Sequence, residues 1–181
     1  AYVALDKNDT YFAAKKFLEA ELLYPQSWWA PKSALMDSYS YYLQNYYAEA
    51  LLNLDRYLRT YPTDVNQDYA HYLIAMCYYE TIEDEKRDSN PLLRANNKFN
   101  YIIKNYPNTD FAMDAKFKMG LIEDILASKE MYLGRHYIKK PNWIPAMKRF
   151  QSVLKEYDQT IFVEEAIHRF VETNYKLGLL E

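Results

Sequence analysis

The feature that most constrains this chain is a frame of four positions that recurs four times along it. In each copy an alanine is followed four residues later by a large apolar residue, and seven residues after that by a tyrosine. The copies are Ala13, Phe17, Tyr24 and Pro25; Ala50, Leu54, Tyr61 and Pro62; Ala95, Phe99, Tyr106 and Pro107; and Ala146, Phe150, Tyr157 and Asp158. Four copies with fixed internal spacing indicate an internal repeat.

The spacing of the frame predicts a helix with one packed face and a fixed end. Residues four apart share a helix face, so the alanine allows a close approach and the apolar side chain fills the next turn. Proline cannot continue a helix, so each Tyr-Pro pair predicts a stop. Small residues also recur after the prolines, at Ser33, Ala70 and Ala115 and at Ser38, Ala75 and Gly120. Each unit therefore reads as helix, turn, helix, and Gly120 is predicted to be a close contact that Gly120→Leu would disrupt.

The tyrosines of the frame are separated by 37, 45 and 51 residues (24 to 61, 61 to 106, 106 to 157). A small residue, a Tyr, an A-x3-F pair and a Pro, repeated about every 34 residues, is the tetratricopeptide pattern. We therefore predict an all-α fold, a right-handed α-solenoid over residues 1–181 treated as one domain. Its repeats span about 1–25, 26–62, 63–107, 108–158 and a partial 159–181. An ordinary helical bundle would explain the helices but not the frame.

Composition narrows the class further. The chain has 3 glycines, where average usage predicts about 13, so we expect few tight turns and almost no strand. The net charge of −3 gives no general attraction to nucleic acid. A single cysteine excludes an internal disulfide framework. The sequence has no run of 18 apolar residues, so we predict no membrane span. No signal peptide is recognised, and the last repeat has one helix, so we expect the natural chain to continue.

Residues that could carry chemistry are scattered. There is no phosphate-binding glycine loop, no H-E-x-x-H and no C-x-x-C, so we predict no enzyme, no cofactor and no metal. His71, His136 and His168 lie far apart and are expected to be packed or surface residues. Cys77 is expected to be a buried, inert thiol. The acidic run Glu83, Asp84 and Glu85 lacks the spacing and glycine of a calcium loop and is expected to be a solvated insertion before Asn90-Pro91.

One segment is locally basic. Six cations lie between residues 129 and 149, against a single acid, Glu130; they are Lys129, Arg135, Lys139, Lys140, Lys148 and Arg149. A solvated helix face explains this segment as well as a docking surface for an acidic partner does. The arginines favour docking, because the planar guanidinium pairs with a carboxylate through two parallel hydrogen bonds.

Aromatic residues are the other candidates for binding. The chain has 20 tyrosines, mostly at frame and packing positions, and some are expected to line a concave peptide groove. Trp28 and Trp29 are adjacent, and neighbouring helical side chains do not share a face, so one is expected to be partly exposed. They either cap the groove between repeats or anchor a ligand. Tyr24, Trp28 and Tyr41 are the candidate substrate-groove residues.

Several segments together resemble the BamD family of the bacterial β-barrel assembly machinery. They are LDRYLRTYPTDVNQDYAHYLIAMCYY (54–79), the insertion with KRD (86–88) leading to RANNKFNYIIKNYPNTDFAMDA (94–115), and YLGRHYIKKPNWIPAMKRFQSVLKEY (132–157). The last is the most specific, with a basic residue, a turn, a tryptophan and a basic pair. The resemblance covers essentially the whole chain.

This resemblance implies a scaffold on the periplasmic face of the outer membrane. The C-terminal repeats are implied to dock on a POTRA domain of a BamA-type barrel subunit, with Arg149 pairing an acidic residue there. Lys148, Arg135, Lys139, Lys140 and Trp143 complete the implied docking surface. Unfolded outer-membrane proteins are implied at the N-terminal repeats, and other assembly lipoproteins along the chain.

Two functions remain open from the residues themselves. The first is that assembly scaffold; its family's lipidated cysteine is not in this chain, and Cys77 is mid-chain. The second is a generic tetratricopeptide adaptor or co-chaperone that holds a peptide in its concave groove. The adaptor predicts a basic clamp in the first repeats, where the sequence has more acids than lysines.

Overall fold

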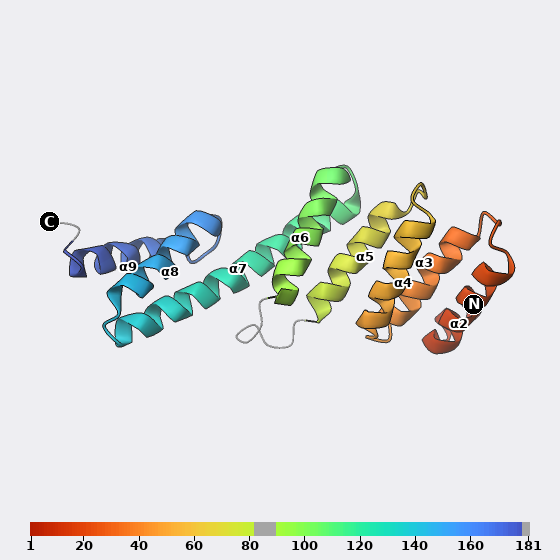
Figure 1. Ribbon diagram of the computed structural model, residues 1–181, viewed down its shortest axis with the longest axis horizontal. Coiled ribbons are helices and arrows are strands. Elements are labelled where there is room, and N and C mark those ends of the chain that lie inside the picture. The colour runs from red at the N-terminus through yellow and green to blue at the C-terminus, as the bar shows by residue number, and fades with distance from the viewer. Residues whose placement is uncertain (82–89, 179–181) are drawn as a thin grey trace. The chain divides into compact units, whose positions relative to one another are not determined.

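The computed structural model describes residues 1–81 and 90–178. Every regular element in these ranges is an α-helix, as the repeat predicts. The helices are α1 Tyr2–Asp6, α2 Thr10–Leu23, α3 Ala30–Tyr42, α4 Tyr47–Thr60, α5 Gln67–Glu80, α6 Asn90–Asn105, α7 Asp110–Lys139, α8 Trp143–Glu156 and α9 Val163–Lys176. Helices that follow one another pack in adjacent pairs, the arrangement of helix-turn-helix repeats (Figure 1). The predicted insertion at 83–89 lies outside the described residues.

Packing divides the chain into two compact units, each with its own core. The first unit has described residues 1–81 and 90–116, and the second unit has described residues 117–178. In the first unit, α2 packs on α3, α3 on α4, α4 on α5 and α5 on α6. In the second unit α8 packs on α9. A single solenoid domain over the whole chain stays a prediction.

The repeated frame marks the core in both units. Its alanines and its large apolar residues, from Ala13 and Phe17 to Ala146 and Phe150, are all buried. The tyrosine directly follows the last helical residue in all four copies, at Tyr24, Tyr61, Tyr106 and Tyr157. The stop signals therefore work as predicted, although Tyr24 itself remains exposed.

Helix starts also follow sequence signals. Asp9 caps α2 by accepting a hydrogen bond from the Phe12 amide at 3.2 Å. Gly178 closes α9 with a φ of 70°, a left-handed conformation that glycine adopts without strain. The first helix of the fourth repeat, α7, is the longest described helix, with 30 residues from Asp110 to Lys139.

The prediction for Gly120 is wrong. This residue is exposed on α7, and no described atom lies within 4 Å of the position that a Cβ would occupy. The close contact is made instead by Gly134, where a Cβ would lie 2.5 Å from Cε1 of Phe150. Phe150 is fully buried, so its ring has little room to move. The glycine that allows two helices to approach is therefore paired with the frame's own aromatic residue.

Candidate interaction surfaces

The basic segment places Arg149 and Lys148 on one small pocket of the second unit. The pocket has a volume of about 180 Å³ and is lined by Tyr137 from α7 and by Pro145, Lys148, Arg149 and Ser152 from α8. Lys148 and Ser152 follow one another at a spacing of four, so they share a face of α8. The Ser152 hydroxyl donates to the Lys148 carbonyl at 3.2 Å, which holds the serine side chain against its own helix.

Arg149 already has an acidic partner within the chain. Its Nη1 donates to Oε1 and Oε2 of Glu130 on α7, at 3.1 and 3.0 Å. The hydrogen bond to Glu130 is also the main reason why the pKa of the Arg149 guanidinium is raised. The side chain of Glu130 is 19% exposed and that of Arg149 is 41% exposed. Glu130 therefore lies deeper than Arg149, whose side chain also has a hydrogen bond with Tyr137 and remains partly exposed.

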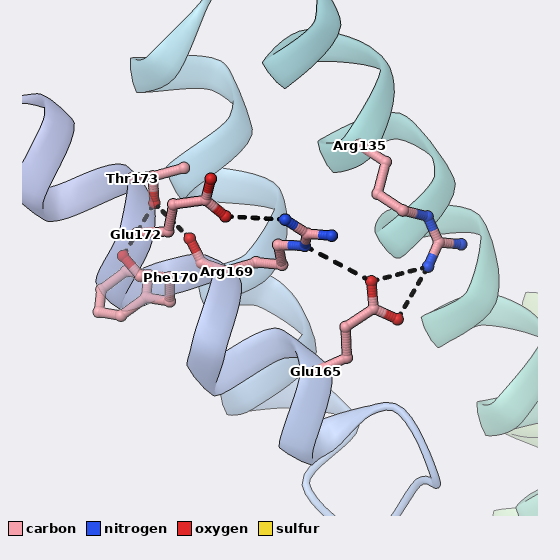
Figure 2. A network of polar contacts seen from close by, with 6 residues as sticks. All are labelled: Arg135, Glu165, Arg169, Phe170, Glu172 and Thr173. Atoms are coloured by element: carbon pink, nitrogen blue, oxygen red, sulfur yellow. Dashed lines mark hydrogen bonds and ion pairs between the residues drawn. The ribbon is translucent and has the colours of Figure 1, made fainter.

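Arg135, also predicted to dock, belongs to a different ion-pair network. Its Nη1 lies 2.9 Å from Oε2 of Glu165, which joins α7 to α9 (Figure 2). Figure 2 shows Arg169 between two acids, with Nε 3.7 Å from Glu165 and Nη1 2.8 Å from Glu172. Exposed ion pairs of this kind contribute little stability each. In this network Arg135 links α7 to α9.

The other predicted docking residues lie near the turn between α7 and α8. Lys139 is the last residue of α7 and Lys140 follows it; both are exposed. Trp143 begins α8 and is partly buried. Of the predicted set, the structure thus brings only Lys148 and Arg149 together in a pocket.

The candidate groove residues of the first unit are also dispersed. A cavity of about 400 Å³ is lined mainly by apolar side chains, among them Tyr2, Phe17, Tyr24 and Trp29. Trp28 is 76% exposed and packs against Trp29, with ring centroids 4.0 Å apart and ring planes tilted by 32°. Tyr41 is partly buried on α3 and does not line this cavity. Tyr24 therefore lines the cavity, whereas Trp28 does not line it but contacts Trp29, which does.

A buried polar cluster beside this cavity was not found from the sequence. Glu21 on α2 accepts hydrogen bonds from both Nη1 and Nη2 of Arg56 on α4, at 2.6 and 2.8 Å, and from the Tyr61 hydroxyl at 3.0 Å. Asp37 on α3 lies in the same region, accepts a bond from Asn53 at 3.1 Å and is only 1% exposed. Its Oδ1 has no hydrogen-bond partner among the described residues.

The electrostatics of Asp37 follow from this burial. Desolvation raises its pKa to about 7, an effect that the nearby Arg56 cation opposes and the Glu21 anion reinforces. The sequence signal for this cluster was Glu21 within the apolar run AELL. An acid on a buried helix face requires a hydrogen-bonding or charged partner.

Histidine and cysteine take structural positions. His71 lies among the rings of Tyr101 and Tyr106, and burial lowers its pKa, whereas His136 and His168 are exposed. Cys77 is fully buried, as predicted, and desolvation raises the pKa of its thiol to about 12, which disfavours the reactive thiolate. Within residues 1–81 and 90–178, His, Cys, Asp and Glu nowhere form a group of three suited to a metal ion.

Helical hairpins that repeat a packing frame define a tetratricopeptide-like helical repeat protein. Comparison with known families then identifies the family. The chain belongs to the YfiO family, described as an outer membrane lipoprotein, whose model matches residues 1–181. None of the described helices is long and apolar enough to span a membrane.

Individual relatives agree with the family match. The chain is 38% identical over 177 residues to the outer membrane protein assembly factor BamD of Caulobacter vibrioides. It is 36% identical over 177 residues to the BamD of Rickettsia prowazekii, and 31% identical over 182 residues to that of Neisseria meningitidis serogroup B. These matches cover 98%, 98% and 93% of this chain, but 58%, 70% and 67% of the relatives. The chain thus spans little more than half the length of the Caulobacter protein.

Proposed function

We propose that this chain is a non-catalytic scaffold subunit of the machinery that assembles outer-membrane β-barrel proteins. The observation that carries this proposal is the match of nearly the whole chain to relatives named outer membrane protein assembly factors. A repeat of helical hairpins suits such a role, because stacked repeats offer extended surfaces for several partners. The scaffold would work at the periplasmic face of the outer membrane as a lipid-anchored protein, a location that the family description, outer membrane lipoprotein, supports.

The docking surface of this scaffold is the basic face of the second unit. Arg149 and Lys148 share a pocket on α8, and no carboxylate among the described residues pairs with Lys148. An acidic partner would therefore meet one unneutralised ammonium and the outer side of a guanidinium. The partner proposed is the POTRA region of a BamA-type barrel subunit, and Lys139, Lys140 and Trp143 would extend the contact along the turn before α8.

The receiving surface for unfolded barrel proteins is the aromatic cavity of the first unit. Its lining is apolar and partly open, and the exposed Trp28 and Tyr24 lie at or beside it. Rigid aromatic rings offer large contact areas with little loss of side-chain entropy, which suits recognition of an extended apolar peptide.

The docking proposal is tested by calorimetric binding of this chain to the isolated POTRA region of the same organism's barrel subunit. Micromolar or tighter binding is expected for the wild type. Arg149→Glu should weaken it by at least about thirtyfold, since loss of a charged interface partner costs about 2–5 kcal/mol. The matched control is Lys155→Glu, an equal charge change at an exposed position of α8 outside the pocket. Equal losses in both variants, or no binding by the wild type, would count against docking here.

The aromatic cavity also favours a second candidate function. A generic adaptor that holds an apolar peptide segment would use the same cavity without any POTRA contact. Titration of an extended, aromatic-rich peptide, followed through the fluorescence of Trp28 and Trp29, separates the two. Peptide binding by a chain that ignores the POTRA region would favour the adaptor.

A further inference from the structure

The buried polar cluster of the first unit contains more acid than base. Glu21 on α2 is 4% exposed and Asp37 on α3 is 1% exposed. Among the described residues Arg56 is the one cation whose charge acts on Asp37, and both of its terminal nitrogens are bonded to Glu21. Asp37 accepts one hydrogen bond, from Asn53 to Oδ2, while Oδ1 has no donor among the described residues. Two buried carboxyl groups therefore share one arginine.

The net charge of this cluster depends on a single proton. With Asp37 protonated, the Glu21 anion and the Arg56 cation cancel. With Asp37 ionised, the cluster has a net charge of −1 away from water, and an unpaired buried charge is costly. If Arg56 is drawn toward Asp37, its contact with Glu21 weakens, and if it stays with Glu21, Asp37 remains unpaired. The other polar groups around the two acids are neutral and supply no second cation: Tyr41, Asn53 and Tyr61.

Helix α2 depends on this cluster more than the other helices of the first unit do. Glu21 joins α2 to α4 by accepting hydrogen bonds from Arg56 and from the Tyr61 hydroxyl. Otherwise α2 packs on α3 and on α1, and α1 has only 5 residues, none of them buried. A weaker contact at Glu21 should therefore loosen α2 first.

The aromatic cavity lies beside the same two helices. Its lining includes Ala20 of α2, which directly precedes Glu21, and Ser33 of α3. Ser33 and Asp37 are four residues apart and share a face of α3. A change in how firmly α2 is held against α3 therefore changes the wall of the cavity.

We infer that Glu21 and Asp37, through their competition for Arg56, form a pH-sensitive switch that holds α2 in place while Asp37 is protonated and loosens α2 and the cavity wall when Asp37 ionises. The inference needs no binding partner and so stands apart from the proposed function.

The direction of the switch follows from the burial of Asp37. Desolvation is the main cause that raises its pKa from 3.8 to about 7 in the folded chain. In the loosened state the carboxyl group is hydrated and ionises near its ordinary value. The equilibrium constant for loosening should therefore rise with pH between these two values, by at most about tenfold per pH unit, and level off above pH 7.

Amide hydrogen exchange of the full 181-residue chain tests the switch between pH 5 and pH 8, after correction for the intrinsic pH dependence of exchange. Opening of α2 should increase more than about tenfold from pH 5 to pH 7, whereas opening of α5 and α6 should change less than about threefold. The cavity is followed by fluorine NMR of 5-fluorotryptophan at Trp29, which lines it. This signal, assigned with Trp29→Phe, should shift or broaden over the same interval.

Three variants separate the switch from general effects of charge. Asp37→Asn should abolish the pH response of α2. Glu21→Gln removes the competing acid and leaves Arg56 for the ionised Asp37, so the response should fall below about threefold. Glu19→Gln makes the same change of charge at an exposed position of α2, two residues away, and should retain the wild-type response.

Three outcomes would overturn the inference. In the first, α2 of the wild type shows no pH response. In the second, α2, α5 and α6 open in parallel, which would mean that Asp37 acts on the whole unit. In the third, Glu19→Gln loses the response as Glu21→Gln does. None of these outcomes involves binding to the POTRA region, so failure of the switch and failure of the proposed docking are distinguishable.

Discussion

Two arginine–glutamate pairs, one in each unit, use the same residues differently. Arg56 gives both arms of its guanidinium to Glu21, whose side chain is only 6% exposed and also accepts the Tyr61 hydroxyl. Arg149 gives a single nitrogen to both oxygens of Glu130, which is more exposed. The first geometry uses the guanidinium fork within the fold and joins α2 to α4. The second uses one nitrogen of the guanidinium and leaves the Arg149 side chain 41% exposed, which is compatible with the docking proposed for the second unit.

The largest expected effect is on the Arg56–Glu21 pair, in which the acid is buried. Arg56→Ala leaves the Glu21 carboxylate buried without its cation, and breaking such a pair typically costs about 3–5 kcal/mol. We expect a loss of that order in the free energy of unfolding, measured by urea denaturation. Replacement of both partners, Glu21→Leu with Arg56→Leu, should recover most of the loss, because no unpaired charge remains. A loss below about 1 kcal/mol in the single variant would mean that the two pairs are energetically alike.

The next effect is a pH dependence of the unfolding free energy that arises from Asp37 in the first unit. The pKa of Asp37 is raised to about 7 in the folded chain, from a reference of 3.8, mainly by desolvation. The folded state therefore binds a proton that the unfolded state releases between these values, so stability is highest below pH 4 for this group and falls as pH rises through 7. The loss is at most about 1.4 kcal/mol per pH unit.

Asp37→Asn removes this titration. Between pH 5 and pH 7 the unfolding free energy of the variant should lack the fall that Asp37 causes in the wild type. At pH 8 it should exceed the wild-type value. The groups that face Asp37 are Glu21, Arg56 and Asn53, so Asn53→Ala serves to check that the slope comes from the carboxyl itself. Parallel pH profiles for wild type and Asp37→Asn would remove Asp37 as the cause.

A smaller effect is expected from helix packing in the second unit, where the exposed ion pairs contribute little stability. Gly134→Ala places a methyl group 2.5 Å from the buried Phe150 ring, and such overpacking typically costs about 1–3 kcal/mol. Gly120→Ala, in the same helix but in open space, should instead stabilise by about 0.5–1 kcal/mol. Thermal melts of the two variants should shift in opposite directions, and equal shifts would contradict the packing described here.

The smallest effect concerns the exposed pair itself. Glu130→Ala should lower the unfolding free energy by less than about 1 kcal/mol, because partly exposed ion pairs contribute little. Urea denaturation beside Arg56→Ala makes the comparison direct. A loss as large as that of Arg56→Ala would assign the Glu130 pair to the fold rather than to binding.

Much of the fold could be predicted from the chain because each repeat carries its own packing and stop signals. Ala95, Phe99 and Tyr106 mark a helix, its face and its end within twelve residues, and neighbouring repeats supply what is missing. Gly120 misled because the spacing that buries Ser38 and Ala75 does not bury the matching position of the much longer α7. A small residue shows where close packing is possible, and only the neighbouring helix decides whether it occurs.

The candidate site was less accessible to sequence reasoning. Arg149 could be singled out as a cation in a basic segment, but its partner Glu130 lies 19 residues earlier on another helix. Likewise Arg56 and Glu21 are 35 residues apart. Such pairs depend on the register between helices, which composition and periodicity leave open. In the sequence Glu130 stands out only as the single acid among six basic residues. Such a pattern does not distinguish an internal ion-pair partner from a chance placement.

The buried Cys77 has a practical consequence for all of these experiments. Burial raises the pKa of its thiol to about 12, so very little of the reactive thiolate forms at pH 7, and the sulfur is shielded by the core. The natural chain should therefore resist maleimide dyes and oxidative dimerisation while folded. A cysteine introduced in the lining of the pocket, for example Ser152→Cys, would then be the position that takes a spectroscopic label, with no need to replace Cys77 first.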